Sequence, residues 1–491
     1  MTNTTKTATA SAEPAGCGNW RAVDTALWCY LFLPVPIFLV GFFIPALGLP
    51  LTAIAVAAAA HFIPRRRLSA ESVHRPWPDW MLLALLAAAW AMLGGAGHVF
   101  HANGIDWVPR FAVLRDLVVE PWPPRYGGGH DVQLLRAPLA YYLPPALLAH
   151  ASRLALADAL LLAWTWLGLA LFFCATFTGS RQVKLAAAVI FACASGLDVV
   201  GLWLRTGSLP WPTQHIEWWA AGLQYSSNST LLFWVPNHGL PGWIAAGWLW
   251  RFRNDPAFLA RLPTLFLPLM LWSPLVAIGL LPLASAAAAK HWRALRLSAP
   301  TLLTSLGLLA LPAGLLAAYL LQGMFGGGAA EPTALTPTAP ILMQPIGFGA
   351  KLLFVLLEAG IFCIFLIRRE SSPLTFATTA TLLVLPGLQF GPNNDLLMRA
   401  SIPALCILWL AMAEELSAPE NPQGQSRGWR IALLILVVLG AVTPMQEVHR
   451  ALAGHSWKAD TRITAPQALD GFPPHYFVSE RRAWLSSVLR R

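Results

Sequence analysis

Long apolar runs recur along most of this 491-residue chain and limit what it can fold into more than any other feature. Several runs extend over roughly 17 to 25 residues, the length that an α-helix needs to cross the hydrocarbon core of a bilayer. Hydrophobic residues make up 56% of the chain and charged residues 11%, a balance that soluble proteins of this size do not show. The sequence therefore predicts an all-α, polytopic membrane protein.

The apolar runs predict about 13 transmembrane helices. They cover residues 28–44, 47–63, 80–97, 159–177, 185–204, 231–250, 262–289, 301–321, 347–367, 374–391, 400–416 and 430–448. The stretch at 262–289 is interrupted near Pro268 and Pro274, and we expect it to form a two-helix hairpin. Residues 139–158 contain two adjacent prolines and several polar side chains, so we expect a helix that lies on the membrane surface and does not cross it.

Lys and Arg side chains gather at the ends of these runs and give the chain a formal net charge of +10. Such clusters mark the cytoplasmic side of a membrane protein, so we attribute the basic balance to orientation and expect no nucleic-acid partner. With Arg65–Arg67 in the cytoplasm, we expect a cytoplasmic N-terminal segment 1–27, a transmembrane domain 28–448 with a first outer loop at about 98–158, and an extracytoplasmic tail 449–491. The abundant Ala, Arg and Trp suggest a bacterium, and hence its inner membrane.

The first outer loop carries many of the scarce charges. Its segment "HVFHANGIDWVPRFAVLRDLVVEPWPPRYGGGHDVQLLRAP", residues 98–138, contains eight formally charged side chains and three histidines. Apolar residues at helical spacing in "RFAVLRDLVV" predict a short surface helix with one apolar face. Asp106 follows an apolar run by a few residues, which places its carboxylate near the level of the lipid headgroups. Asp106 is therefore our main candidate for a catalytic residue.

The segment "GIDWVPRFAVLRDLVVEPWPPRY" resembles the first outer loop of the GT-C class of glycosyltransferases, in which a span is followed by an Asp, a surface helix, a turn and a second surface helix. These polytopic enzymes take a sugar from a polyprenyl-phosphate carrier and attach it to an acceptor outside the cytoplasm. The resemblance implies such a donor, a glycan, lipid or protein acceptor, and Asp106 at the position of the family's loop carboxylate. Many members carry two acidic residues close together, whereas Trp107 follows a single Asp106 here.

One carboxylate is sufficient for this chemistry. The leaving group of a sugar phosphodiester is already a stable anion, so its departure does not need the second carboxyl that a glycosidase uses as an acid. Asp106 would accept the proton of the acceptor hydroxyl, a role usually worth roughly 10²–10⁴ in rate, and direct displacement would invert the anomeric carbon. The participation of Mg²⁺ or Mn²⁺ is left open, with His98, His101 and Asp106 as the candidate ligands.

The departing phosphate needs cations close to it, and the planar fork of arginine suits phosphate oxygens. Arg399, in "PNNDLLMRASIP", is the leading candidate because the positive-inside bias removes most arginines from the outer ends of spans. The alternative is that Arg399 has no role in binding and only extends its guanidinium to the membrane interface. The further candidates are Arg110, Arg115, Arg136 and Arg205.

Candidates for an acceptor or sugar pocket lie in two later outer segments, where carboxylates, amides and aromatic rings can contact sugar hydroxyls and ring faces. They are Glu217, Tyr225, Asn237, His238, Asn394 and Asp395. The alternatives are an aromatic belt at the membrane interface for the first segment and ordinary turn chemistry for Asn394 and Asp395.

Two other functions remain open. A transporter or flippase of lipid-linked sugars would be expected to show more charged residues at mid-membrane and paired broken helices. Glu358 is the charged residue in the chain that hints at transport. An O-antigen ligase or polymerase would use a similar donor but would place its large outer loop later in the sequence.

Overall fold

Prolines divide the apolar runs into more helices than there are runs. The computed structural model describes residues 21–64, 77–128, 132–152, 154–322, 346–389, 394–419, 427–470 and 476–490. The N-terminal segment before residue 21 and the cluster Arg65–Arg67, on which the predicted orientation rests, lie outside these ranges. In the described residues, Pro34, Pro236 and Pro274 each occupy the first position of a helix, where the missing N–H has no intrahelical partner to lose.

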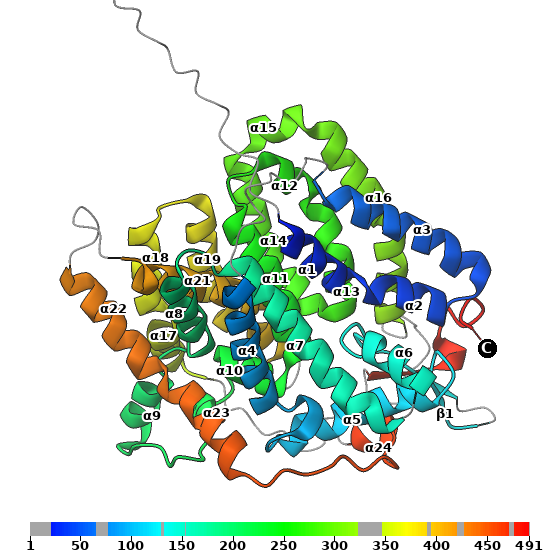
Figure 1. Ribbon diagram of the computed structural model, residues 1–491, viewed down its shortest axis with the longest axis horizontal. Coiled ribbons are helices and arrows are strands. Elements are labelled where there is room, and N and C mark those ends of the chain that lie inside the picture. The colour runs from blue at the N-terminus through cyan, green and yellow to red at the C-terminus, as the bar shows by residue number, and fades with distance from the viewer. Residues whose placement is uncertain are drawn as a thin grey trace, which may run out of the picture.

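Helices make up most of the described chain (Figure 1). In the first half they are α1 (Ala22–Phe32), α2 (Pro34–Phe42), α3 (Pro45–Phe62), α4 (Trp77–Leu93), α5 (Gly104–Val119), α6 (Leu143–Ser152), α7 (Ala157–Thr176), α8 (Arg181–Ala192), α9 (Asp198–Thr206), α10 (Asn228–Trp234) and α11 (Pro236–Arg251). They continue as α12 (Pro256–Arg261), α13 (Phe266–Trp272), α14 (Pro274–Lys290), α15 (Trp292–Leu297), α16 (Ala299–Leu321), α17 (Phe348–Val355), α18 (Ile361–Arg369), α19 (Pro373–Val384), α20 (Asp395–Ala400), α21 (Ile402–Ser417), α22 (Arg427–Gly440), α23 (Val442–Ala453) and α24 (Ala465–Ala468).

The protein is a helical, membrane-embedded protein. Within the described residues, seven helices are long and apolar enough to cross a bilayer: Ala22–Phe42, Pro45–Phe62, Leu154–Thr176, Ala299–Leu321, Phe348–Arg369, Asp395–Ser417 and Arg427–Ala453. Four shorter apolar helices lie among them. α6, in the predicted surface segment, has 10 residues and a length of about 15 Å, too short to span a bilayer.

The predicted break in the stretch 262–289 is confirmed at one of its two prolines. α13 ends at Trp272 and α14 begins at Pro274. Pro268 does not interrupt α13, because it lies in the first turn, where the backbone N–H groups have no intrahelical acceptor.

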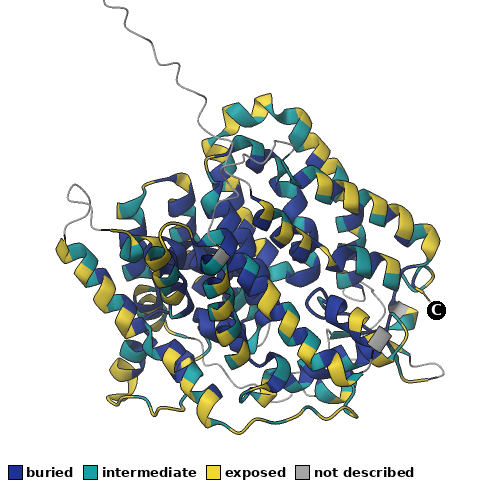
Figure 2. Cartoon of the chain, in the orientation of Figure 1, coloured by how far each residue is buried: buried dark blue, intermediate teal, exposed yellow. Residues whose placement is uncertain are grey.

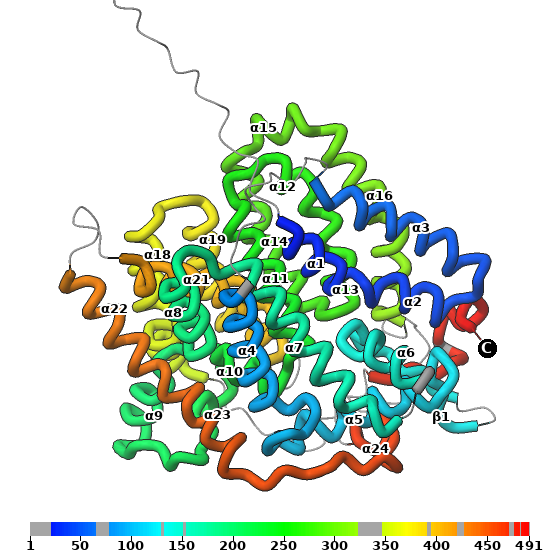
Figure 3. The backbone as a smooth tube through the Cα atoms, viewed as in Figure 1, coloured from blue at the N-terminus to red at the C-terminus, as the bar shows by residue number. Residues whose placement is uncertain are grey.

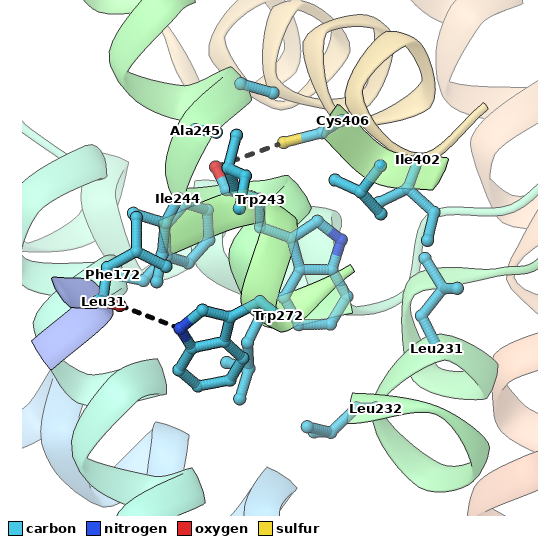
Figure 4. Close-up of a cluster of buried hydrophobic side chains, with 14 of the residues drawn as sticks. Leu31, Phe172, Leu231, Leu232, Trp243, Ile244, Ala245, Trp272, Ile402 and Cys406 are labelled. Atoms are coloured by element: carbon cyan, nitrogen blue, oxygen red, sulfur yellow. Dashed lines mark hydrogen bonds between the residues drawn. The ribbon is translucent and has the colours of Figure 1, made fainter. Parts of the chain in front are cut away.

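Two helices form the centre of the bundle. Every residue of α11 from Pro236 to Trp250 is buried, as is α21 from Ile402 to Ala413. A Cβ on Gly242 would lie 2.4 Å from Cγ2 of Ile402, so glycine permits the close approach of these helices. Figure 4 shows the indoles of Trp243 and Trp272 in this core, with the Trp272 Nε1–H bonded to the Leu31 carbonyl at 2.8 Å.

The outer helices expose apolar side chains, whereas the interior is buried (Figure 2). In α16 only 17% of the most apolar 18-residue stretch is buried, and in α3 28%. Exposed apolar faces on helices of this length are what lipid contact requires.

The chain is mostly helical, as predicted, and it also contains a small antiparallel sheet in the order β1-β2-β3. β1 (Arg125–Tyr126) and β2 (Gln133–Leu135) come from the first outer loop, and β3 (Phe477–Ser479) comes from the tail. Strands of two or three residues are too short to show an alternating pattern in the sequence.

The tail lies against the first outer loop along much of its length. Figure 3 traces it from α23 along the lower edge of the view to α24, beside α5. Trp457 Nε1–H donates to the Ala102 carbonyl at 2.8 Å, and the Ala465 N–H donates to Asp116 Oδ2 at 2.7 Å. The tail and the loop therefore form one structural unit.

Candidate functional site

Asp106 lies in the first turn of α5, and the position of this turn is fixed by its neighbours. Asn103 caps the helix, with its Oδ1 accepting the Asp106 N–H at 3.0 Å. The fully buried Trp107 donates its Nε1–H to the Phe233 carbonyl at 2.6 Å. A Cβ on Gly95 would lie 1.8 Å from Trp107 Nε1, so only glycine at that position leaves room for the indole. The Asp106 side chain itself is 25% exposed.

Arg110 follows Asp106 by one helical turn and joins it to three other segments. Its Nη2 lies 3.2 Å from Asp106 Oδ1, and its Nε donates to the Trp234 carbonyl at 2.9 Å. Its Nη1 donates to Asn237 Oδ1 at 2.6 Å and to the Tyr142 hydroxyl at 3.2 Å. Arg110 is thus held in one orientation beside the Asp106 carboxylate.

Two residues at the start of α11 continue this network into the core. Asn237 Nδ2 lies 3.2 Å from His238 Nε2, and His238 Nδ1 lies 2.7 Å from Ser273 Oγ. Ser273 precedes Pro274 at the start of α14 and is fully buried. The predicted pair Asn237 and His238 therefore lies beside Arg110, inside the protein.

Arg399, the predicted phosphate ligand, approaches the same histidine from another part of the chain. His238 lies within electrostatic range of both Arg399 and Arg110. Arg399 forms an ion pair with Asp395 at 2.9 Å, and its side chain is 23% exposed. α20 carries both residues and packs against α14 so closely that a Cβ on Gly279 would lie 2.0 Å from the Ala400 carbonyl oxygen.

A shallow recess opens beside this network. It is lined by His101, Ala102, Asn103, Phe233, Trp234, Glu447, Arg450 and Ala451. Asn103 caps the helix that carries Asp106, and the Trp234 carbonyl is bonded to Arg110. The recess thus borders two residues that are hydrogen-bonded to the Asp106–Arg110 pair.

Other predicted site residues stabilise the surrounding structure. Arg115 pairs with Asp116 at 2.8 Å and donates to the Thr461 carbonyl at 3.0 Å, which fastens the tail to α5. Arg136 donates to the Gln322 carbonyl and Arg205 to the Trp219 carbonyl. Arg115 and Arg205 have no hydrogen bond to Asp106 or Arg110 among the described residues.

Three of the predicted pocket residues are buried. Glu217 is fully buried and accepts the Ser227 N–H at 2.8 Å, and the Tyr225 hydroxyl donates to the Leu382 carbonyl at 2.6 Å. Asn394 has a left-handed backbone with φ 52° and is 4% exposed. Asn tolerates this conformation better than most residues, and Asn394 directly precedes α20, which carries Asp395 and Arg399.

The candidate metal ligands have other partners. His98 Nδ1 lies 2.7 Å from Asp158 Oδ2, and His101 Nδ1 lies 2.9 Å from the His455 carbonyl oxygen. Across the described ranges, no three His, Cys, Asp or Glu side chains are grouped as a metal site would require.

Sequence analysis missed Tyr142, Ser273, Trp234, Glu447 and Arg450. Tyr142 and Trp234 lie in apolar surroundings where an aromatic residue has no distinct signal, and Ser273 interrupts an apolar run at a proline. Glu447 and Arg450 lie one helical turn apart on α23, and such a spacing on its own is equally typical of a surface ion pair.

Comparisons with protein-family models, characterised proteins and solved structures find no match for this chain.

Proposed function

We propose that the protein is an inverting glycosyltransferase that transfers a monosaccharide from a polyprenyl-phosphate carrier to an extracytoplasmic glycan, lipid or protein. In this proposal about 13 crossings of a bacterial inner membrane leave the N-terminus in the cytoplasm and the site and tail outside. One observation supports it: Asp106 pairs with Arg110, Arg110 bonds to Asn237, and the neighbouring His238 lies within electrostatic range of both Arg110 and Arg399, although Arg399 comes from a distant part of the chain. A carboxylate paired with one guanidinium supplies a base, and the second guanidinium in the same electrostatic neighbourhood is a candidate binding site for phosphate.

In the proposed reaction Asp106 acts on the acceptor. Its Oδ1 is paired with Arg110, whereas Oδ2 has no hydrogen-bond partner among the described residues. Oδ2 takes the proton of the acceptor hydroxyl as that oxygen attacks the anomeric carbon. The bond from the anomeric carbon to the phosphate oxygen breaks, and its electron pair leaves with the polyprenyl phosphate, so the sugar is inverted.

The two arginines have different roles in this scheme. Arg110 uses its Nε and both Nη atoms on Trp234, Tyr142, Asn237 and Asp106, and it orients the carboxylate. Arg399 pairs with Asp395 through Nη2 and is partly exposed, so it can bind the departing phosphate with its remaining N–H groups. A guanidinium in a site poor in water stabilises the developing negative charge more strongly than one in bulk water.

The test compares Asp106→Asn with the wild type and with Asp460→Asn, a control in the exposed part of the tail. Purified proteins are given a panel of radiolabelled polyprenyl-phosphate hexoses and pentoses with membrane extract, and donor binding and label transfer are measured separately. We expect Asp106→Asn to bind donor normally and to lose transfer by roughly 10²-fold or more, and Asp460→Asn to match the wild type. Equal transfer by Asp106→Asn would remove Asp106 as the base.

A specific observation favours transport as a second candidate function. Asp198 and Glu358 are fully buried and interact with each other, and Glu358 lies in a π-helical turn, Leu356–Gly360. Buried acidic residues of membrane proteins often belong to ion or proton paths. The transporter would be favoured if the protein moves labelled lipid-linked sugar across proteoliposome membranes and transfers no label to an acceptor. An enzyme similar to O-antigen polymerases would be favoured if label transfer is accompanied by polymerisation of the acceptor.

A further inference from the structure

Asp198 and Glu358 form a pair of buried carboxyl groups that the proposed sugar transfer does not use. Glu358 lies near the middle of the apolar helix Phe348–Arg369, about 15–17 Å from either end at the helical rise per residue. Asp198 begins α9, which contacts the π-helical turn that carries Glu358 (Figure 1). A charged side chain at this depth in a membrane is costly, so the state of protonation of the pair matters for its function.

The backbone packs closely around Glu358. A Cβ on Gly196 would lie 1.9 Å from Glu358 Oε2, so glycine is needed where the segment before α9 passes this oxygen. The Leu197 N–H donates to the Leu357 carbonyl at 3.2 Å, which joins the same segment to the π-helical turn. Turns of this kind are frequent at functional sites, and this one holds the Glu358 side chain against Gly196 and Asp198.

The hydrogen bonds of the two carboxyl groups differ. Asp198 Oδ2 accepts the Ser195 hydroxyl at 3.0 Å and the Thr443 hydroxyl at 2.7 Å, as an ionised carboxylate does. Glu358 Oε1 accepts the Trp219 Nε1–H at 2.8 Å, whereas its Oε2 is shielded from solvent and has no partner of this kind among the described residues. Two carboxylates are both acceptors, so the hydrogen bond between these side chains requires a proton on one of them. Oε2 of Glu358 is the oxygen that lacks a donor.

The charges around the pair favour a bound proton. The titratable and charged groups on the neighbouring elements are His215, Glu217, Tyr225, Cys363, Glu447 and Arg450. Arg450 is already paired with Glu447 at 2.8 Å. Its charge is therefore balanced by Glu447, and the buried acids keep an excess of negative charge that a proton reduces.

His215 is a basic group within electrostatic range of Asp198 and Glu217. Its Nδ1 lies 2.8 Å from Glu447 Oε1, so a neutral ring donates the Nδ1–H and keeps a lone pair on Nε2. The side chain is 7% exposed, and Nε2 is shielded from solvent without a hydrogen-bond partner among the described residues. Glu447 lines the recess beside α23. This arrangement gives the acids a proton carrier whose other side is bonded to a residue of the recess.

We propose that Asp198 and Glu358 form a binding site for one proton, held on Glu358 Oε2 and donated to Asp198, and that His215 exchanges this proton with the recess. On loading, the proton leaves Nε2 of the imidazolium and binds the carboxylate, which leaves a neutral ring and a pair with one negative charge. The inference does not rest on the proposed sugar transfer. For the transport alternative it specifies the coupling ion as a proton.

Infrared spectroscopy tests the site, because the carbonyl stretch of a neutral carboxylic acid is separate from the bands of carboxylates. All proteins carry Glu217→Gln, since burial raises the pKa of Glu217 to about 7 and its carboxyl would add a band of its own. At pH 7 we expect a neutral-acid band in this parent protein and its loss when Glu358→Gln is added. Asp460→Asn, a substitution of a carboxylate that is ion-paired on the tail surface, is the matched control and should leave the band unchanged.

Transfer from H2O into D2O tests the role of His215, because the band shifts as the bound proton exchanges for deuterium. His215→Gln keeps an N–H that can bond to Glu447 and removes the titratable nitrogen. We expect it to slow the exchange by at least about tenfold. His150→Gln is the matched control, since His150 also bonds through Nδ1, to the Val118 carbonyl at 2.7 Å, and it should exchange as the parent does.

The proton site is overturned if the parent shows no band that Glu358→Gln removes. Asp198→Asn is the second variant, in case Glu358→Gln does not fold: replacing the acceptor of the proton should shift the band, and an unchanged band also overturns the site. Loss of the band when sodium chloride replaces choline chloride would show a sodium site instead. Unchanged exchange in His215→Gln would refute the role of His215. A parent protein that transfers no label but keeps the band would refute only the proposed sugar transfer.

Discussion

The substitution Gly279→Ala tests whether the packing of α14 against α20 positions Arg399. The new Cβ would lie 2.0 Å from the Ala400 carbonyl oxygen and 2.7 Å from its carbonyl carbon. Both atoms belong to backbone and cannot rotate away, so the two helices must separate by roughly 1.4 Å to restore an ordinary contact. We expect this overpacking to cost about 1–3 kcal/mol of stability, which leaves most native proteins folded.

The larger effect is expected on activity. Arg399 is the residue next to Ala400 and must move with it, and a displacement of about 1 Å at a reacting group can reduce the rate by about 10²-fold. Label transfer from polyprenyl-phosphate sugars and the melting temperature are measured together. Gly307→Ala in α16 is the matched control because its Cβ would meet nothing within 4 Å, and in a helix interior it should stabilise by about 0.5–1 kcal/mol. Unchanged transfer by Gly279→Ala, with a lower melting temperature, would refute the link between this contact and the site.

Three further predictions concern other parts of the molecule. Burial raises the pKa of Glu217 to about 7 from 4.5, so the folded state binds a proton more tightly than the unfolded state, and stability should fall by about 3 kcal/mol as the pH rises through this window. Glu217→Gln should remove that slope when melting temperatures are compared at pH 5 and pH 8; an unchanged slope would point to another group. Glu358→Gln should melt close to the wild type because a neutral amide can still accept the Trp219 Nε1–H, whereas Glu358→Ala leaves that buried donor without an acceptor and should lose about 1–3 kcal/mol; equal melting temperatures for the two variants would show that this hydrogen bond contributes little. Gly95→Ala should displace Trp107 and reduce both stability and transfer, and a wild-type melting curve would contradict the 1.8 Å approach.

The sequence predicts individual helices and helix breaks well, but it does not predict which of these segments contact one another in the fold. The helix after residue 103 and the break before Pro274 follow from local patterns, namely apolar spacing and the missing N–H of proline. Asp106 and Arg110 are both candidates from the sequence, and their spacing of four residues allows them to pair on one helical face.

The rest of the site depends on tertiary packing. Nothing near Arg399 in the sequence indicates that it lies within electrostatic range of His238, because this follows from how α11, α14 and α20 pack. Arg115 and Arg205 are of the residue type expected of phosphate ligands, yet both donate to backbone carbonyls. A guanidinium suits a carbonyl as well as a phosphate, and only the fold decides which it meets.

The sheet between the first outer loop and the tail has a consequence for the order of assembly during biosynthesis. Arg125 bonds to Glu480, a residue 355 positions later in the chain, so the loop emerges from the ribosome long before its partner strand exists. Until residues 455–490 have been synthesised, the backbone edge of β2 and the carbonyl of Ala102 have no partner from the tail. Chains that stall before this point would hold most of their membrane helices and yet lack the tail side of this sheet, which gives a quality-control system a feature by which to recognise unfinished protein.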